Sequence, residues 1–282
     1  IKLVLILTFS YAIIQSIGGV LSGSLALIAD AGHMFSDAAA LLLAFIAYRI
    51  ARKPATGRFT FGFHRVRVLA ALANGVTLIA LVIWIIWLAV ERITQPPEIL
   101  TGPMLVVAVI GLLVNVAGAW ILYDRNSNDG NLKGAFLHVI GDLLGSLGAI
   151  TAAIGIMLTG WTILDPLISV FVAMLVVRSA WQLIISSTDI ILQAAPVGIT
   201  TDVVKKDLLA IPEIAETGHV HVWILADKSV IATVHVTPVT WIDPLRLPQI
   251  VSKRLRENFS FSHVTVQVDP PGQLHMQENL DE

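Results

Sequence analysis

The sequence contains no cysteine. This absence excludes disulfide bonds, thiolate metal ligands and cysteine nucleophiles, so any metal site must use His, Asp, Glu, backbone carbonyls or water. Charged residues are scarce as well: Asp, Glu, Lys and Arg make up 13% of the chain, whereas about 25% is typical of soluble domains. Hydrophobic residues account for 56%. This balance favours a protein embedded in a membrane.

Six apolar stretches are long enough to cross a bilayer, which requires about 20 residues each. They cover residues 1–21, 25–50, 66–90, 100–123, 132–158 and 163–186. Beyond residue 191, short alternating segments and two helical segments follow one another in the order α-β-β-α-β, which is typical of a small α+β domain. The sequence therefore predicts an all-α six-helix transmembrane domain in residues 1–190 and a small α+β domain in residues 191–282.

Basic residues are distributed unevenly between the five connecting loops. The second and fourth loops contain eight, and the other three loops contain only Arg92. The eight are Arg49, Arg52, Lys53, Arg58, Arg65, Arg67, Arg125 and Lys133. Because loops rich in Lys and Arg remain in the cytoplasm, we expect both termini and the C-terminal domain there, in a multi-pass protein of the inner or plasma membrane.

The second apolar stretch carries three ionisable residues, Asp30, His33 and Asp37. A charge at the bilayer centre costs about 2.5–3.5 kcal/mol, so such groups face a cavity, one another or a cation. Their i, i+3, i+7 spacing places them on one helical face. His33 and Asp37, at i and i+4, can present a nitrogen and an oxygen to one point.

The fifth apolar stretch repeats this pattern with His138 and Asp142. If the two helices face each other, the four side chains form a complete tetrahedral set for Zn²⁺, whereas Ca²⁺ and Mg²⁺ prefer six or more oxygens. The alternative is that each His–Asp pair bonds internally and only holds helices together. Asp30 is expected to support the ligands or to lie on the access path. Asp165, at the start of the sixth stretch, is predicted to cap a helix.

With these paired motifs, the "FTFGFHR" loop and the "HVHVW" segment, the chain resembles the cation diffusion facilitator family of metal/proton antiporters. The resemblance implies a homodimer that exports a divalent metal from the cytoplasm in exchange for protons. His rather than Asp at position 33 resembles the zinc-transporting members. The implied transport ligands are His33, Asp37, His138 and Asp142. Zinc needs neutral imidazole and ionised carboxylate, so its binding displaces protons, and alternating access completes the cycle.

The family also binds regulatory zinc in its cytoplasmic domain. Here Gly218 and Gln267 stand at two positions of that cluster, together with His235 and Asp269. Because alternate residues of a strand share a face, the histidines of this domain can still form a simpler metal site. The alternative is that the same histidines are surface or interface residues. The candidates for that site are His219, His221, His235, His263 and Asp269. In the basic loop, His64 resembles a weak interfacial metal position of the family.

Two other classes of protein are compatible with an intramembrane zinc site. A zinc hydrolase would keep one metal position open for water beside three protein ligands, but the sequence has no HExxH motif. A membrane-bound metal sensor would not need the paired transmembrane motifs. Membrane topology explains the basic residues of the second and fourth loops, and no other basic patch indicates a nucleic-acid partner. The sequence therefore predicts a transporter, not an enzyme, with the metal ion, the bilayer and a second copy of the chain as partners.

Overall fold

The computed structural model describes residues 2–122, 130–226, 229–240 and 246–270, with the side chains of 2–5, 122 and 130–140 left out of the description. The chain forms two compact units. One comprises Ile1–Ile46 with Ala70–Ile184, and the other Ala47–Leu69 with Ile185–Glu282.

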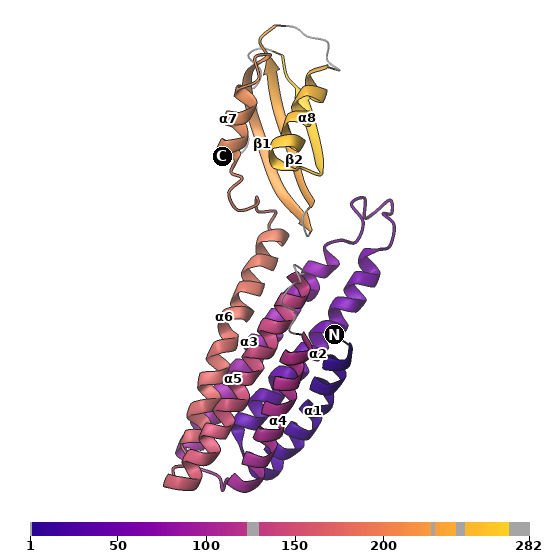
Figure 1. Cartoon of the computed structure of the whole chain (residues 1–282). Helices are drawn as coiled ribbons and strands as arrows, with labels where there is room; N and C mark the ends of the chain where they lie inside the picture. Colours follow the sequence, from indigo (N-terminus) through magenta and orange to yellow (C-terminus); the bar gives the residue numbers. More distant parts are fainter. Residues whose placement is uncertain (1, 123–129, 227–228, 241–245, 271–282) are drawn as a thin grey trace. The chain divides into compact units, whose positions relative to one another are not determined.

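Each predicted apolar stretch corresponds to one helix of the structure (Figure 1). Five of the helices have described apolar segments long enough to cross a membrane, and the described apolar part of α1, Ile6–Ser22, is shorter. The observed helices differ from the predicted stretches by only a few residues at most ends. Their bounds are α1 Lys2–Ser22, α2 Leu25–Ala51, α3 Val66–Thr94, α4 Thr101–Leu122, α5 Gly130–Thr159 and α6 Leu164–Ile191.

The first half of α2 is buried between the other helices of the bundle, whereas most of its second half is exposed. Ala26 and Leu27 join a buried cluster with α4 and α5, whereas Ala29 joins one with α3 and α6. Met34 packs against α1. Small residues allow membrane helices to approach closely without a hydrophobic driving force. The part of α2 that carries the three ionisable residues is therefore buried or half-buried, with residues of all five other helices packed around it.

The N-terminus of α2 is capped by a residue from another helix. Asp165, fully buried at the start of α6, accepts hydrogen bonds from Ser24 Oγ at 2.6 Å, Leu25 N at 2.6 Å and Ala26 N at 3.1 Å. Arg92, at the end of α3, places Nη1 3.4 Å from the same carboxylate. Asp165 is a helix cap, as predicted, but it caps α2 rather than the helix on which it stands. One carboxylate thus joins three helices at one end of the bundle.

The C-terminal domain has the predicted order of elements. Its three-stranded sheet has the order β1-β2-β3, with β1 antiparallel and β3 parallel to the central strand β2. The six-helix bundle followed by an α+β domain confirms the predicted fold class. The bounds of these elements are α7 Thr201–Leu209, β1 Ile214–Ala226, β2 Ser229–Pro238, α8 Arg246–Phe259 and β3 His263–Val268.

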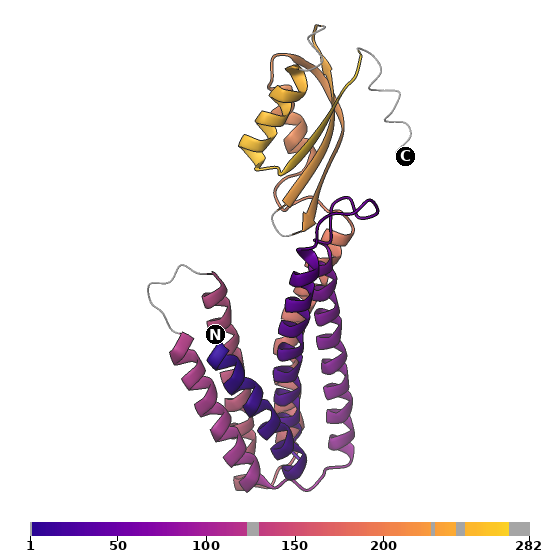
Figure 2. The same ribbon diagram turned by 90° about the vertical axis from the view of Figure 1, so that its right-hand side faces the viewer.

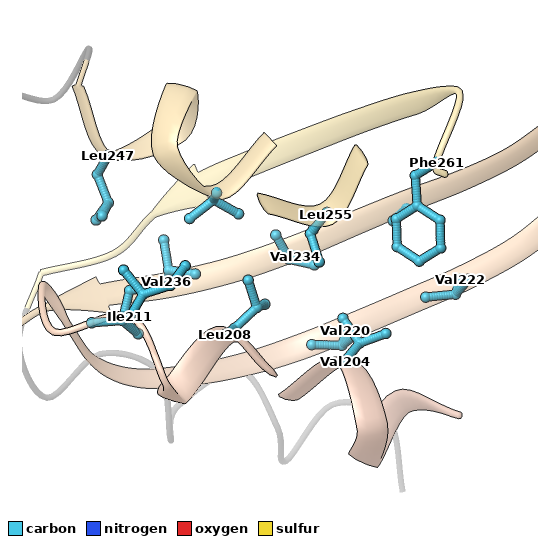
Figure 3. Packing of buried hydrophobic residues seen from close by; sticks show 13 residues of the cluster. Val204, Leu208, Ile211, Val220, Val222, Val234, Val236, Leu247, Leu255 and Phe261 are labelled. Carbon is cyan, nitrogen blue, oxygen red and sulfur yellow. The ribbon is translucent and has the colours of Figure 1, made fainter. Parts of the chain in front are cut away.

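Both helices of this domain cover one face of the sheet (Figure 3). Val220 and Val222 on β1 point into the core between the sheet and the helices, as do Val234 and Val236 on β2. Because alternate residues of a strand point to opposite faces, His221 and His235, which stand between these valines, lie on the other face of the sheet. Arg254 of α8 holds α7 through hydrogen bonds of 2.9–3.2 Å to the Asp207 carboxylate, and these bonds raise the pKa of its guanidinium.

Candidate metal site

Two ligand candidates lie one turn apart on α2. His33 Nε2 is 3.5 Å from Asp37 Oδ2. Neighbouring ligand atoms in a tetrahedral zinc site are roughly 3.3–3.5 Å apart, given metal–ligand distances near 2.0–2.2 Å. The i, i+4 spacing on a regular helix therefore already provides one edge of such a site.

Helix α5 adds a third ligand candidate from far along the sequence. Asp142 is 2% exposed, and its carboxylate lies with His33 and Asp37 so that one ligand atom from each is within 4.8 Å of the others. Among the side chains that the structure describes, this is the only group of three His, Asp or Glu residues at such distances. A burial of this kind is costly for a carboxylate unless a cation or a proton neutralises it.

The fourth predicted ligand, His138, stands on α5 one turn before Asp142. Its side chain lies outside the described residues. The helical spacing i, i+4 puts both residues on the same face of α5. The structure therefore brings together three of the four predicted ligands and leaves the fourth as an expectation from helix geometry.

The site is partly accessible. The side chains of His33 and Asp37 are 21% and 23% exposed, while Asp142 is buried. Helices α1, α4 and α5 diverge from α2, α3 and α6 towards the end of the bundle at which α2 ends (Figure 2). The two ligand candidates of α2 are thus more exposed than the carboxylate of α5.

Asp30 is not one of the three converging ligands, but it connects the surrounding helices. It is 2% exposed and accepts a hydrogen bond of 2.6 Å from Gln15 Nε2 of α1. On its other side it lies against α5 at Gly145, where a Cβ would be 2.5 Å from Asp30 Oδ1. The buried pair of Asn115 and Ser146, bonded at 3.2 Å, links α4 to α5 nearby.

Sequence reasoning had no means of finding Gln15 or of assigning the partner of Gly145, because a lone amide and a lone glycine carry no spacing signal. The position of the ionisable Asp30 within an apolar stretch indicated only that it must have partners, not which residues they are.

Substitution of Gly145 by alanine is expected to destabilise the protein by about 1–3 kcal/mol, because the new methyl group displaces the Asp30 carboxylate or moves α5. Zinc affinity should fall with it, since α5 carries Asp142. Unfolding in mixed micelles and calorimetric zinc titration measure the two effects. Gly102→Ala is the matched control, as nothing lies within 4 Å of a Cβ there. If Gly145→Ala costs as much in an Asp30→Ala background, contact with Asp30 is not the cause.

The predicted cytoplasmic site residues are only partly gathered. On the sheet face opposite the core, the rings of His219 and His235 have centroids 5.1 Å apart and those of His219 and His221 are 6.3 Å apart. His235 Nδ1 lies 2.9 Å from Asp269 Oδ2. His263 pairs with Ile231, four residues from His235, which corresponds to about 13 Å along the strand. The structure thus groups four candidates and leaves His263 apart.

His64 lies exposed in the loop between α2 and α3. It lines a pocket with Arg52, Lys53 and Arg67, and no second His, Asp or Glu is among the residues that line it. The structure therefore surrounds this candidate with cationic groups rather than with further metal ligands.

A bundle of apolar helices that brings an imidazole and two carboxylates together in its interior defines a membrane-embedded cation-binding protein. The chain belongs to the cation efflux family: residues 1–192 match the cation efflux transmembrane domain, and residues 196–271 match the cation efflux protein cytoplasmic domain. This confirms the resemblance inferred from the motifs and identifies a multi-pass membrane protein that moves metal cations. The prediction that it is not an enzyme is confirmed by this membership, and the hydrolase alternative is excluded.

Similar proteins cover almost the whole chain. The zinc transporter ZitB of Escherichia coli K12 is 42% identical over 264 residues, which span 93% of this chain and 84% of the relative. The metal cation efflux system protein CzcD of Cupriavidus metallidurans is 38% identical, with 95% and 85% coverage. A cadmium, cobalt and zinc/H(+)-K(+) antiporter of Bacillus velezensis is 37% identical, with 97% and 90% coverage.

Proposed function

We propose that the protein exports Zn²⁺ from the cytoplasm in exchange for protons, by alternating access around His33, Asp37, His138 and Asp142. The observation that carries this proposal is the convergence of His33 and Asp37 from α2 with the buried Asp142 from α5. A membrane cation carrier needs ligands from at least two elements that can separate, because a site built on one helix cannot change its coordination as the bundle opens.

The choice of zinc follows from ligand chemistry and from the relatives. Two imidazoles and two carboxylates suit a tetrahedral divalent transition metal rather than Ca²⁺ or Mg²⁺. ZitB is named a zinc transporter, and the Bacillus relative is named for cadmium, cobalt and zinc. We therefore propose that Zn²⁺ is the main substrate and that Cd²⁺ and Co²⁺ are further substrates.

Proton exchange follows from the same ligands, because metal and proton compete for each of them. Zinc binds neutral imidazole and ionised carboxylate, so loading the site releases protons and protonation releases the metal. The Bacillus relative is named an antiporter of metal against H(+) and K(+). We propose H⁺ as the counter-ion here, since every proposed ligand is itself a protonatable group.

Topology and assembly belong to the same proposal. The uneven distribution of basic residues supports cytoplasmic termini and a cytoplasmic C-terminal domain. The domain boundary that we propose near residue 191 is supported by the two family matches, which end at residue 192 and begin at residue 196. We propose that two copies associate through this domain. The face that carries His219, His221, His235 and Asp269 is the proposed position of a regulatory zinc ion.

Zinc flux in proteoliposomes tests the function. With the cytoplasmic side outward and an acidic lumen in K⁺-free buffer, Zn²⁺ uptake should be several-fold faster than without a pH gradient. A protonophore should remove the difference. A Zn²⁺ flux that is the same with and without the pH gradient would contradict proton exchange. A Zn²⁺ flux that depends on K⁺ instead would identify K⁺ as the counter-ion. Tight zinc binding without any flux would favour the metal-sensor alternative instead.

A further inference from the structure

The loop between α2 and α3 forms a cationic pocket that contains none of the four proposed transport ligands. Its volume is about 440 Å³, and its lining includes Arg52, Lys53 and Arg67. None of the lining residues is Asp or Glu. All of them lie between residues 48 and 67, so the pocket belongs to a single compact unit of the chain. Three cationic side chains around one concavity whose lining contains no acidic residue favour the binding of an anion, and Arg52 and Lys53 are the two on which this inference rests.

Two of these cations are not neutralised by the part of the chain that the structure describes. Within that part, neither Arg52 nor Lys53 takes part in an ion pair, and the Arg52 guanidinium carbon lies 5.8 Å from the centre of the Tyr48 ring. Contact with an aromatic face holds a guanidinium in place and leaves its N–H groups available. A guanidinium fork and a lysine ammonium together match the oxygens of a phosphate group.

The loop has a defined shape, so the pocket is preformed. Phe59 N donates to Thr56 Oγ1 at 3.2 Å, and Gly62 N donates to Phe59 O at 2.9 Å. Gly62 has φ +73°, a conformation that side chains other than glycine rarely adopt. These bonds close tight turns within residues 56–62, part of which line the pocket. Membrane topology alone explains why the loop is basic, but it does not require the cations to surround one concavity.

The surroundings of the pocket indicate which phosphate it receives. It extends from the last turn of α2 to the first turn of α3, where the two spans leave the membrane. Tyr48, Phe59 and Phe61 are 50%, 47% and 54% exposed beside the cations. Exposed aromatic rings next to Lys and Arg are typical of the membrane–water interface. A phosphate at this depth belongs to a lipid headgroup.

We propose that this pocket binds the headgroup of an anionic phospholipid, with Arg52 and Lys53 on the phosphate and the aromatic side chains in the interface. Basic pockets at the ends of membrane helices recognise anionic lipids in this way. The inference does not depend on metal transport, because lipid binding is measurable in the absence of zinc.

Native mass spectrometry of the full-length, metal-free protein in detergent tests the proposal. The probes are phosphatidylglycerol, zwitterionic phosphatidylcholine and inorganic phosphate. The test variant is Arg52→Gln with Lys53→Gln, and the control is Arg58→Gln with Arg65→Gln, which removes the same charge from the same loop outside the pocket lining. The test variant should weaken phosphatidylglycerol binding by about tenfold or more, and the control by much less.

Three results would overturn the inference. Equal losses in the two variants would mean that the loop attracts anionic lipid only through its total charge. Equal affinity for phosphatidylcholine would remove the requirement for net negative charge. Binding of inorganic phosphate that displaces phosphatidylglycerol at similar concentrations would identify a soluble anion as the ligand.

Discussion

Replacing Asp142 by alanine is expected to reduce zinc flux by roughly 100-fold or more, since removal of groups that only support metal ligands already costs about 10–100-fold. Asp142 is the described ligand from α5, and it is buried opposite His33 and Asp37. Without it, the described site contains only ligands from one helix. Zinc affinity, measured calorimetrically in detergent, should fall with the flux. His33→Ala should have a similar effect.

The control substitutions for this experiment lie outside the site. Asp189→Ala removes an exposed carboxylate near the end of α6, and His263→Ala removes the histidine that stands apart in the C-terminal domain. Both should transport zinc at close to the rate of the unaltered protein. Full flux in Asp142→Ala or His33→Ala, with the protein folded, would refute the proposed ligand set. Loss of flux with unchanged zinc affinity would assign the residue to another step of the cycle.

Replacing Asp165 by alanine is expected to lower the free energy of unfolding by about 3–5 kcal/mol, the usual cost of removing one partner of a buried ion pair. The change leaves Arg92 and the first N–H groups of α2 without their carboxylate. A negative charge also stabilises the N-terminus of a helix. Reversible unfolding in mixed micelles measures the loss.

Asp165→Asn separates the contribution of charge from that of hydrogen bonding. The amide keeps one oxygen that can accept from Ser24 or α2, but it loses the attraction to Arg92. Its cost should therefore lie between those of the unaltered protein and Asp165→Ala. An alanine variant within about 0.5 kcal/mol of the unaltered protein would show that water or another group replaces the cap. Because α2 carries His33 and Asp37, zinc affinity should decrease in parallel with stability.

The helices and the two ligand motifs were predictable because both depend on local sequence. An apolar stretch of about 20 residues can satisfy its backbone in a bilayer only as a helix. Within a helix, the i, i+4 spacing alone places His33 and Asp37 one turn apart, and the same rule relates His138 to Asp142. The alternating strands and amphipathic helices of the C-terminal domain were predictable for the same reason.

The partners of single polar residues were not predictable in this way. Asp165 was expected to cap a helix, but the helix it caps begins 140 residues earlier in the chain. Gln15 and Gly145 meet Asp30 from two different helices. Strand alternation also did not separate His263 from the other histidines. The register between β2 and β3 pairs His263 with Ile231, four residues from His235.

By itself, the sequence determined that the chain enters a membrane, how many helices it forms, and that two of them carry paired imidazole and carboxylate groups, because hydrophobic length and helical period are properties of neighbouring residues. Only the tertiary structure decided that the first half of α2 is buried between the other helices, that Asp142 of α5 approaches His33 and Asp37, and that a cationic pocket forms between α2 and α3. Those features depend on side-chain volumes and on buried hydrogen bonds between distant segments, which are settled only when the helices pack.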